Sequence, residues 1–243
     1  MKDRFPIRIG ISACLLGQKV RYDGGHREDP FVTRTLGKHF EWVPVCPEVE
    51  IGLGVPRETI RLELIDGNIR LRAPESDLDH TDRMRSYALR RMAELKKEKL
   101  SGYILKSDSP SCGMLRVRVH KVDNRVFRSG TGLFAEVLLE YFPNLPVEEE
   151  ERLAHPKLRE NWLERVFAYH SFHLLWATSW TIRDLIAFHT RQKFALLEHS
   201  RSAYARLGRM LGSGAGMRRD ELRSSYEREF MLALSRIAKK QTG

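Results

Sequence analysis

Residues 103–113 read Tyr-Ile-Leu-Lys-Ser-Asp-Ser-Pro-Ser-Cys-Gly. The apolar start of this stretch has the length of a buried strand, and the Ser, Pro and Gly residues after it are typical of a loop. Cys112 lies in that loop. A cysteine in such a loop is not there mainly for core packing, so we interpret the loop as one that presents a functional thiol.

Two apolar runs upstream end in the same way. Residues 7–12 precede Cys14, and residues 42–45 precede Cys46. If these runs and residues 103–105 are neighbouring parallel strands, all three cysteines converge at the carboxyl edge of the sheet, where open α/β sheets bind ligands. The long spacing between them means that this convergence would be tertiary.

The overall composition narrows the class of protein. With 243 residues, two domains are the reasonable expectation, and the formal net charge of +10 favours an anionic partner such as nucleic acid. No apolar run approaches the roughly 20 residues of a membrane helix, and the N-terminal residues do not resemble a secretory signal. We therefore expect a cytoplasmic protein.

Three cysteines are an odd number, which argues against a disulfide framework. Free thiols can be ligands or nucleophiles, and ordinary buried thiols are the simpler alternative. Structural zinc sites prefer four ligands at short paired spacings that this chain lacks. An iron-sulfur cluster accepts cysteines from distant loops and usually takes four, so three would leave one iron open to substrate.

The remaining patterns predict an α/β N-terminal domain with a parallel or mixed sheet and flanking helices. Residues 60–72 alternate as a hairpin around Asp66-Gly67, and its arginines Arg61, Arg70 and Arg72 share a polar face that is either solvated or in contact with phosphate. Helical spacing over residues 81–98 supplies a crossover between parallel strands.

Two further elements follow in the same domain. Residues 116–120 alternate as another strand, and Gly130-Thr131-Gly132 opens a helix that reaches about residue 142. The free backbone N–H groups at the start of that helix either hold an anion or simply cap the helix.

The boundary is expected within residues 143–156, which include the acidic run 148–151. We divide the chain into residues 1–147 and an all-α domain of residues 148–243. Helices are predicted near residues 157–177, 181–211 and 220–239, with the Gly-rich residues 212–216 as a flexible link.

Two polar residues close to the cysteines are candidates for catalysis. Glu48 follows Cys46 by two positions, where its carboxylate could be a general base or acid, and Ser109 precedes Cys112 by three, where its hydroxyl could position water or protonate a leaving group. A carboxylate at a helix start and a turn hydroxyl are the structural alternatives.

Several motifs together resemble the thiouracil desulfidase family. They cover about the first 145 residues: Ser12-Ala13-Cys14-Leu15-Leu16-Gly17, Arg21-Tyr22-Asp23-Gly24, Cys46-Pro47-Glu48 with Gly52-Leu53 and Pro56-Arg57, and residues 105–113. Phe188-His189, Lys193, His199, Tyr204 and Leu207-Gly208 are similar to a helical domain of long-unknown function that is fused to this family. The combination resembles the bacterial tRNA 4-thiouridine desulfidases.

The resemblance implies a 4Fe-4S cluster held by Cys14, Cys46 and Cys112, assisted by Glu48 and Ser109. It also implies a thiolated uridine substrate in tRNA, sulfur release without net redox change, a catalytic first domain and a second domain that helps to bind tRNA. A desulfidase for free thiouracil-type bases and a non-catalytic metal protein that binds nucleic acid are the rival interpretations.

Charge independently favours a large RNA partner. From residue 183 onward the chain has thirteen Lys or Arg residues and six Asp or Glu residues, a surplus of seven positive charges. A phosphate backbone could follow such a basic segment, although a solvated helix is the alternative. The candidate RNA-binding residues, placed mostly along one long helix, are Arg183, Arg191, Lys193, Arg201, Arg206, Arg209, Arg218 and Arg219.

Overall fold

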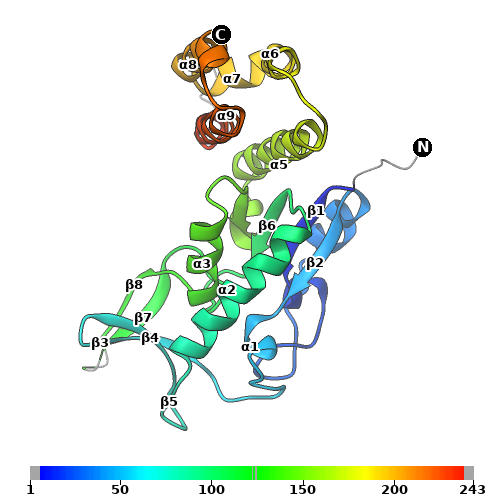
Figure 1. Cartoon of the computed structure of the whole chain (residues 1–243). Helices are drawn as coiled ribbons and strands as arrows, with labels where there is room; N and C mark the ends of the chain where they lie inside the picture. The colour runs from blue at the N-terminus through cyan, green and yellow to red at the C-terminus, as the bar shows by residue number, and fades with distance from the viewer. Residues whose placement is uncertain (1–5, 122, 124, 238–243) are drawn as a thin grey trace. The chain divides into compact units, whose positions relative to one another are not determined.

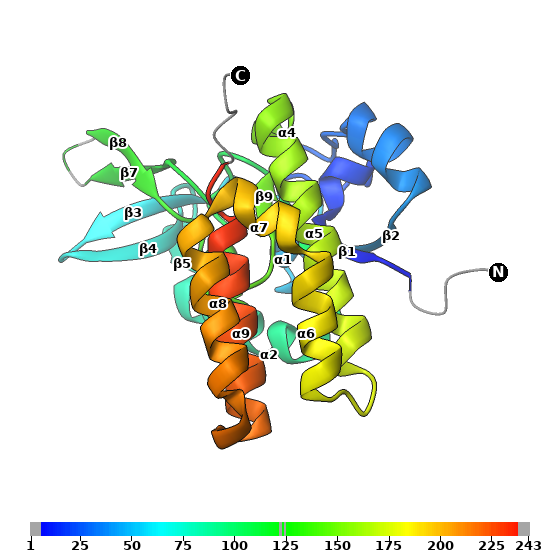
Figure 2. The same cartoon turned by 90° about the horizontal axis from the view of Figure 1, so that it is seen from above.

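The computed structural model describes residues 6–121, 123 and 125–237, and the chain divides into two compact units, Met1–Leu153 and Ala154–Gly243. Figures 1 and 2 show the strands in the first unit and the α5–α9 helices in the second. The predicted fold class, an α/β region followed by a helical region, is confirmed. Within the described residues, no helix combines the length and apolar character needed to cross a bilayer.

The first sheet has four strands in the order β2-β1-β6-β9. They are β1 (Arg8–Ser12), β2 (Glu41–Val45), β6 (Gly102–Leu105) and β9 (Val147–Glu149). All neighbouring pairs are parallel, and the three runs that precede the cysteines are adjacent strands. The predicted parallel arrangement is therefore confirmed, and the carboxyl ends of these strands share one edge.

Helices pack against this sheet through an apolar core. They are α1 (Pro47–Glu50), α2 (Thr81–Lys97), α3 (Leu133–Tyr141) and α4 (Glu150–Leu153), with short 3-10 or π turns at Ala13–Leu16, Phe31–Thr35 and Leu36–Lys38. Phe134 of α3 meets Tyr87 of α2 and Tyr103 of β6, with ring centroids 6.2 and 6.3 Å apart. Helix α2 is the predicted crossover, since it lies between β2 and β6 in the chain.

The second sheet has five strands in the order β5-β4-β3-β7-β8. They are β3 (Arg61–Ile65), β4 (Asn68–Ala73), β5 (Leu78–Asp79), β7 (Val117–Lys121) and β8 (Val126–Gly130). The predicted hairpin is β3-β4. Asp66 and Gly67 have φ values of 49° and 78°, the left-handed pair that a two-residue hairpin turn requires.

The acidic run does not form a linker. Its first residues belong to strand β9, and its last ones begin α4, so the run lies inside the first unit and the expected division after residue 147 falls within a strand. Glu148, Glu149 and Glu150 are all buried. A run of carboxylates normally indicates a solvent-exposed segment. Here each of the three buried carboxylates has protein partners that sequence spacing does not reveal.

The second unit consists of α5 (Pro156–Trp176), α6 (Ile182–Arg191), α7 (Lys193–His199), α8 (Arg201–Ser213) and α9 (Arg219–Leu234), with a 3-10 turn at Gly214–Gly216 in place of the predicted flexible link. The single long helix predicted over residues 181–211 is wrong. Ser200 is extended, and its hydroxyl accepts a hydrogen bond from the Ala203 N–H, which starts a new helix there.

Candidate active site

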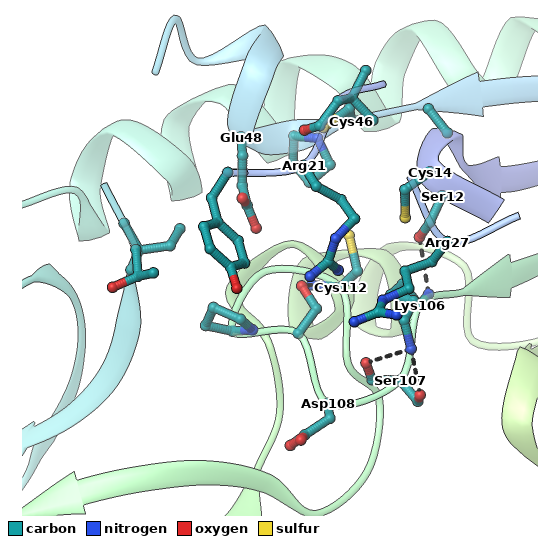
Figure 3. A pocket seen from close by; sticks show the side chains of 18 of the residues that line it. Ser12, Cys14, Arg21, Arg27, Cys46, Glu48, Lys106, Ser107, Asp108 and Cys112 are labelled. Atoms are coloured by element: carbon teal, nitrogen blue, oxygen red, sulfur yellow. Dashed lines mark hydrogen bonds between the residues drawn. The ribbon is translucent and has the colours of Figure 1, made fainter. Parts of the chain in front are cut away.

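All three cysteines line one cavity of about 440 Å³ (Figure 3). Cys14 lies in the turn after β1, Cys46 directly follows β2, and Cys112 lies in the loop after β6. Because β2, β1 and β6 are parallel neighbours, their loops open on the same side of the sheet. The predicted convergence of the cysteines in one site therefore agrees with the structure.

The protein environment keeps these thiols protonated when no metal is bound. Burial, with a smaller effect of Cys46, raises the pKa of Cys14 to about 11. Burial is also the main cause that raises the pKa of Cys46, and it raises the pKa of Cys112 well above the ordinary thiol value. Since the thiolate is the reactive form of cysteine, the raised pKa values make all three thiols poor nucleophiles.

The donor set fits an iron-sulfur cluster. Three thiols are soft ligands suited to iron-sulfur clusters. Among the described residues, no three His, Cys, Asp or Glu side chains are placed to share one metal ion. In an iron-sulfur cluster each thiolate binds a different metal atom, so three cysteines around one cavity are suited to hold such a group.

Ser109 organises the loop that carries Cys112. Its hydroxyl oxygen accepts hydrogen bonds from the backbone N–H groups of Ser111 at 3.2 Å and Cys112 at 3.0 Å. Its carbonyl oxygen accepts from the Gly113 N–H at 2.8 Å. Because a hydroxyl also carries one proton, Ser109 can donate into the cavity that it lines while it holds the loop.

The start of α3 binds the same loop. The N–H groups of Leu133 and Phe134 donate to the carbonyls of Pro110 and Ser111 at 3.2 and 3.0 Å, and the Gly132 N–H donates to the Gly113 carbonyl at 2.7 Å. The suggestion that these N–H groups hold an external anion is therefore wrong. They satisfy the carbonyls of the cysteine loop instead.

Gly132 permits this close approach, which gives the first prediction. A Cβ atom there would lie 2.5 Å from the Ser111 carbonyl and 2.8 Å from the Cys112 nitrogen, so Gly132→Ala must displace the loop or the helix. We expect the free energy of unfolding to fall by about 1–3 kcal/mol, as measured by denaturant unfolding. Gly212→Ala is the control, because nothing lies within 4 Å of its added Cβ; an equal effect of both substitutions would contradict this interpretation.

Glu48 lies in the first turn of α1, which begins immediately after Cys46 with Pro47 at its first position. Its carboxylate lines the cavity and accepts a hydrogen bond from Arg57 Nε at 3.2 Å and another from Arg57 Nη2. Arg57 also donates to the carbonyls of Gly54 at 2.8 Å and Val20 at 3.0 Å. The buried guanidinium therefore fixes the carboxylate in the orientation of a hydrogen-bond acceptor.

A second polar network lies next to Cys14. Lys106 Nζ donates to the Ser107 hydroxyl at 2.8 Å and to the Glu150 carboxylate, which also accepts the Ser107 N–H at 2.7 Å. The hydroxyl of Ser12 accepts the Lys106 N–H at 3.0 Å, a contact drawn in Figure 3. Sequence reasoning placed Arg57 in a motif without a role and missed Glu150, because only the tertiary structure brings Arg57 to Glu48 and Glu150 to Lys106 and Ser107.

Glu149 binds the backbone that directly follows Cys112 and Gly113. Its carboxylate accepts the N–H groups of Met114 at 2.7 Å and Leu115 at 3.2 Å. Burial raises the pKa of Glu149, and these hydrogen bonds oppose that effect only in part. The folded state therefore keeps this proton to a higher pH than the unfolded state does.

This raised pKa predicts a pH-dependent stability. Above the unfolded pKa of about 4.3, the unfolded chain loses the Glu149 proton first, so the free energy of unfolding falls as pH rises toward the folded pKa. Glu149→Gln keeps an oxygen acceptor and does not titrate. We expect its stability relative to wild type to increase as pH rises above about 4.3 in urea unfolding; a pH-independent difference would contradict the assignment.

Cationic groups surround the rest of the cavity. Arg21, Arg27 and Arg118 line it, together with Tyr22 from the Arg-Tyr-Asp-Gly motif. In Figure 3 the guanidinium of Arg21 points into the cavity. The site thus combines soft sulfur donors suited to a thiophilic metal, a carboxylate fixed by Arg57 and several positive charges suited to an anionic substrate.

The predicted RNA-binding residues are all exposed in the second unit, but they lie on several helices. Arg183 and Arg191 belong to α6, Lys193 to α7, and Arg201, Arg206 and Arg209 to α8, while Arg218 directly precedes α9 and Arg219 begins it. Arg206 Nε donates to Glu229 at 2.7 Å, and Arg219 stacks over Trp180 at 4.6 Å.

The histidines of the second motif set make contacts inside the helical unit. His189 forms a hydrogen bond with Tyr226 at 2.9 Å and stacks on Tyr204, and His199 forms a hydrogen bond with Glu164 at 2.7 Å.

Comparison with protein families matches residues 9–150 to "2-thiouracil desulfurase". The chain belongs to this family. Residues 193–242 match a second family, described as a protein of unknown function, DUF1722. The match to the 2-thiouracil desulfurase family spans all three cysteines, Glu48 and Ser109, so the cavity of Figure 3 lies within the family region.

Two relatives are similar to this member of the 2-thiouracil desulfurase family. The uncharacterized protein YbbK of Bacillus subtilis (strain 168) is 32% identical over 111 residues, which are 43% of this chain and 72% of YbbK. The solved structure of the 4Fe-4S-dependent thiouracil desulfidase TudS is 30% identical with a TM-score of 0.49, and the match covers 61% of this chain and 93% of TudS.

Proposed function

We propose that this protein removes sulfur from 4-thiouridine in tRNA, with a 4Fe-4S cluster held by Cys14, Cys46 and Cys112. The observation that carries the proposal is the convergence of these cysteines with Glu48 and Ser109 around one cavity. The family region supports a thiolated uracil ring as the reacting group. A cluster with three protein ligands supplies an iron that can attract the thiocarbonyl sulfur as a Lewis acid.

The reaction is a hydrolysis in which atoms and electrons balance. Water and the thiocarbonyl form a carbonyl and hydrogen sulfide: the oxygen of water bonds to the ring carbon, the carbon–sulfur bond breaks, and the sulfur leaves with the two protons of water. No external oxidant or reductant is required. The residues of this chain have to orient the ring, position water and move protons.

Glu48 is the group that accepts the proton from water. Its carboxylate is an acceptor held by Arg57, which suits a general base better than an acid. Ser109 donates its hydroxyl proton toward the cavity, either to water or to the departing sulfur. Arg21 offers positive charge where negative charge develops on the ring or the leaving sulfur.

The choice of tRNA as substrate is supported by the charge of the second unit. Its eight candidate RNA-binding residues are exposed cations, and the segment from residue 183 has a surplus of seven positive charges. Neutralisation of phosphates by such residues makes nucleic-acid binding strong and dependent on salt. A free thiouracil-type base is the second candidate, favoured by the family description itself.

One experiment separates these substrates. Protein reconstituted under anaerobic conditions is incubated with bulk tRNA and, separately, with free 4-thiouracil over a range of salt concentrations, followed by nucleoside analysis. We expect 4-thiouridine to be lost from tRNA with an equal gain of uridine, and this rate to fall steeply with salt. Turnover of free 4-thiouracil without any loss of 4-thiouridine from tRNA would favour the second candidate.

A further inference from the structure

The five-stranded sheet of the first unit has one apolar face and one arginine-rich face. Leu62, Leu71 and Val119 are fully buried on the apolar side. Because side chains alternate along a strand, the residues next to them point to the opposite side. On β3, β4 and β7 those neighbours include Arg61, Arg72 and Arg118.

The strand register aligns these arginines across the sheet. Arg61 pairs with Arg72 across β3 and β4, and Arg118 pairs with Arg128 across β7 and β8. Leu62 pairs with Val119 in the parallel β3-β7 contact, so the same register one residue earlier places Arg61 beside Arg118. Four guanidinium side chains thus form one row, which we call the arginine row: Arg72, Arg61, Arg118 and Arg128. With about 4.8 Å between strands, the row spans roughly 14 Å.

Local carboxylates do not use up the hydrogen-bonding capacity of the arginine row. Arg118 and Arg128 share one carboxylate, that of Asp108, at 2.8 and 3.4 Å. Arg61 contacts Glu63 at 2.7 Å, and Arg72 pairs with Asp77 and lies 3.9 Å from the same Glu63 carboxylate. Each guanidinium has five N–H donors, so a phosphate can add to these contacts. It can also replace the ion pairs of the exposed Arg118 and Arg128, because exposed pairs contribute little stability.

The arginine row continues into the candidate active site. Arg118 belongs to the row and also lines the cavity, and so does its partner Asp108. Arg21 and Arg27 extend the positive charge along the cavity lining. A polynucleotide with one base in the cavity would therefore have its neighbouring phosphates near the sheet.

We propose that the arginine row binds the phosphodiester backbone of the RNA next to the nucleotide that enters the cavity. This inference rests on the proposed function and extends it, because it assigns RNA contacts to the catalytic unit in addition to the helical unit. Guanidinium groups bind phosphate oxygens in pairs of parallel hydrogen bonds, which favours arginine over lysine in such a surface. A free base has no phosphate and does not need the row.

The test uses the full-length, reconstituted protein with Arg61→Gln, Arg72→Gln and Arg128→Gln combined. Arg118 is left intact because it lines the cavity. The matched control combines Arg90→Gln, Lys96→Gln and Lys97→Gln, which remove the same charge from exposed positions of α2. Circular dichroism and visible absorbance check folding and cluster content in both variants.

We expect kcat/KM for 4-thiouridine tRNA to fall at least about tenfold in the row variant. The slope of log activity against log salt should become shallower by about 2–3, roughly one for each phosphate that the protein no longer neutralises. Turnover of free 4-thiouracil should match wild type. A decrease on tRNA no larger than that of the α2 control, or an equal decrease on free 4-thiouracil, would overturn the inference. If the triple variant does not fold, Arg128→Gln alone should reduce the slope by about one.

Failure of the proposed function is recognised separately. If wild-type protein does not desulfurate tRNA, the proposed function fails, and binding of tRNA measured by gel shift then tests the arginine row. Row-variant protein that binds tRNA as tightly as wild type overturns the inference in that case as well.

Discussion

Substitution of Glu48 by Gln is expected to lower turnover of a thiolated uracil about 100- to 10,000-fold, the usual contribution of a general base. Gln has nearly the same shape as Glu, and its amide oxygen can still accept from Arg57, so the geometry of α1 is kept. An amide, however, cannot accept a proton from water at neutral pH. The iron content and visible absorbance of the reconstituted variant should equal those of wild type.

Steady-state kinetics and iron analysis of the same preparation test this expectation. Glu41→Gln is the control, since Glu41 lies on the strand that leads to Cys46, is exposed and pairs only at the surface with Arg8 among the described residues. Full turnover by Glu48→Gln would remove Glu48 from the reaction. Another group that lines the cavity would then have to activate water.

The second large effect is expected from the cysteines. Ser in place of Cys14, Cys46 or Cys112 substitutes a hard hydroxyl, which stays protonated at neutral pH, for a soft thiolate ligand. Because the chain has three cysteines, no spare thiol can replace the one removed. We expect each single variant to lose most of its iron and visible absorbance, and its turnover to fall to the level of protein without metal.

Iron and sulfide analysis after anaerobic reconstitution measures this change, and circular dichroism checks that the variant is folded. The Glu41→Gln protein again supplies the reference for a surface change. Any one of the three Ser variants with wild-type iron content and turnover would exclude that cysteine as a ligand. Another side chain would then have to be the third ligand of the cluster.

Several features of the fold could be predicted because local patterns determine them. The hairpin of β3 and β4 follows from alternation around Asp66-Gly67, and α2 follows from its helical spacing. The position of each cysteine after a strand-like run predicted the parallel sheet and the shared cavity. In each case a short stretch of sequence contains the information needed.

Other features depend on tertiary partners. Glu149 and Glu150 looked like part of a solvated linker, yet one binds the backbone of Met114 and the other binds Lys106 and Ser107. Arg57 reaches Glu48 through a loop whose conformation sequence spacing does not reveal. The break between α7 and α8 depends on Ser200, whose capping role was hidden within a continuous helical pattern. Strand register, which aligns the arginine row, likewise becomes visible only in the structure.

The central claim is that Cys14, Cys46 and Cys112 together hold one cluster that leaves an iron open beside Glu48. A crystal structure of the protein reconstituted under anaerobic conditions, with anomalous scattering recorded at the iron edge, tests it most directly. The account predicts iron density bonded to all three sulfurs at about 2.3 Å, typical of metal–thiolate bonds, and one iron without a protein ligand in the cavity that Glu48 lines. Iron bound elsewhere, or a fourth protein ligand that closes the cluster, would contradict it.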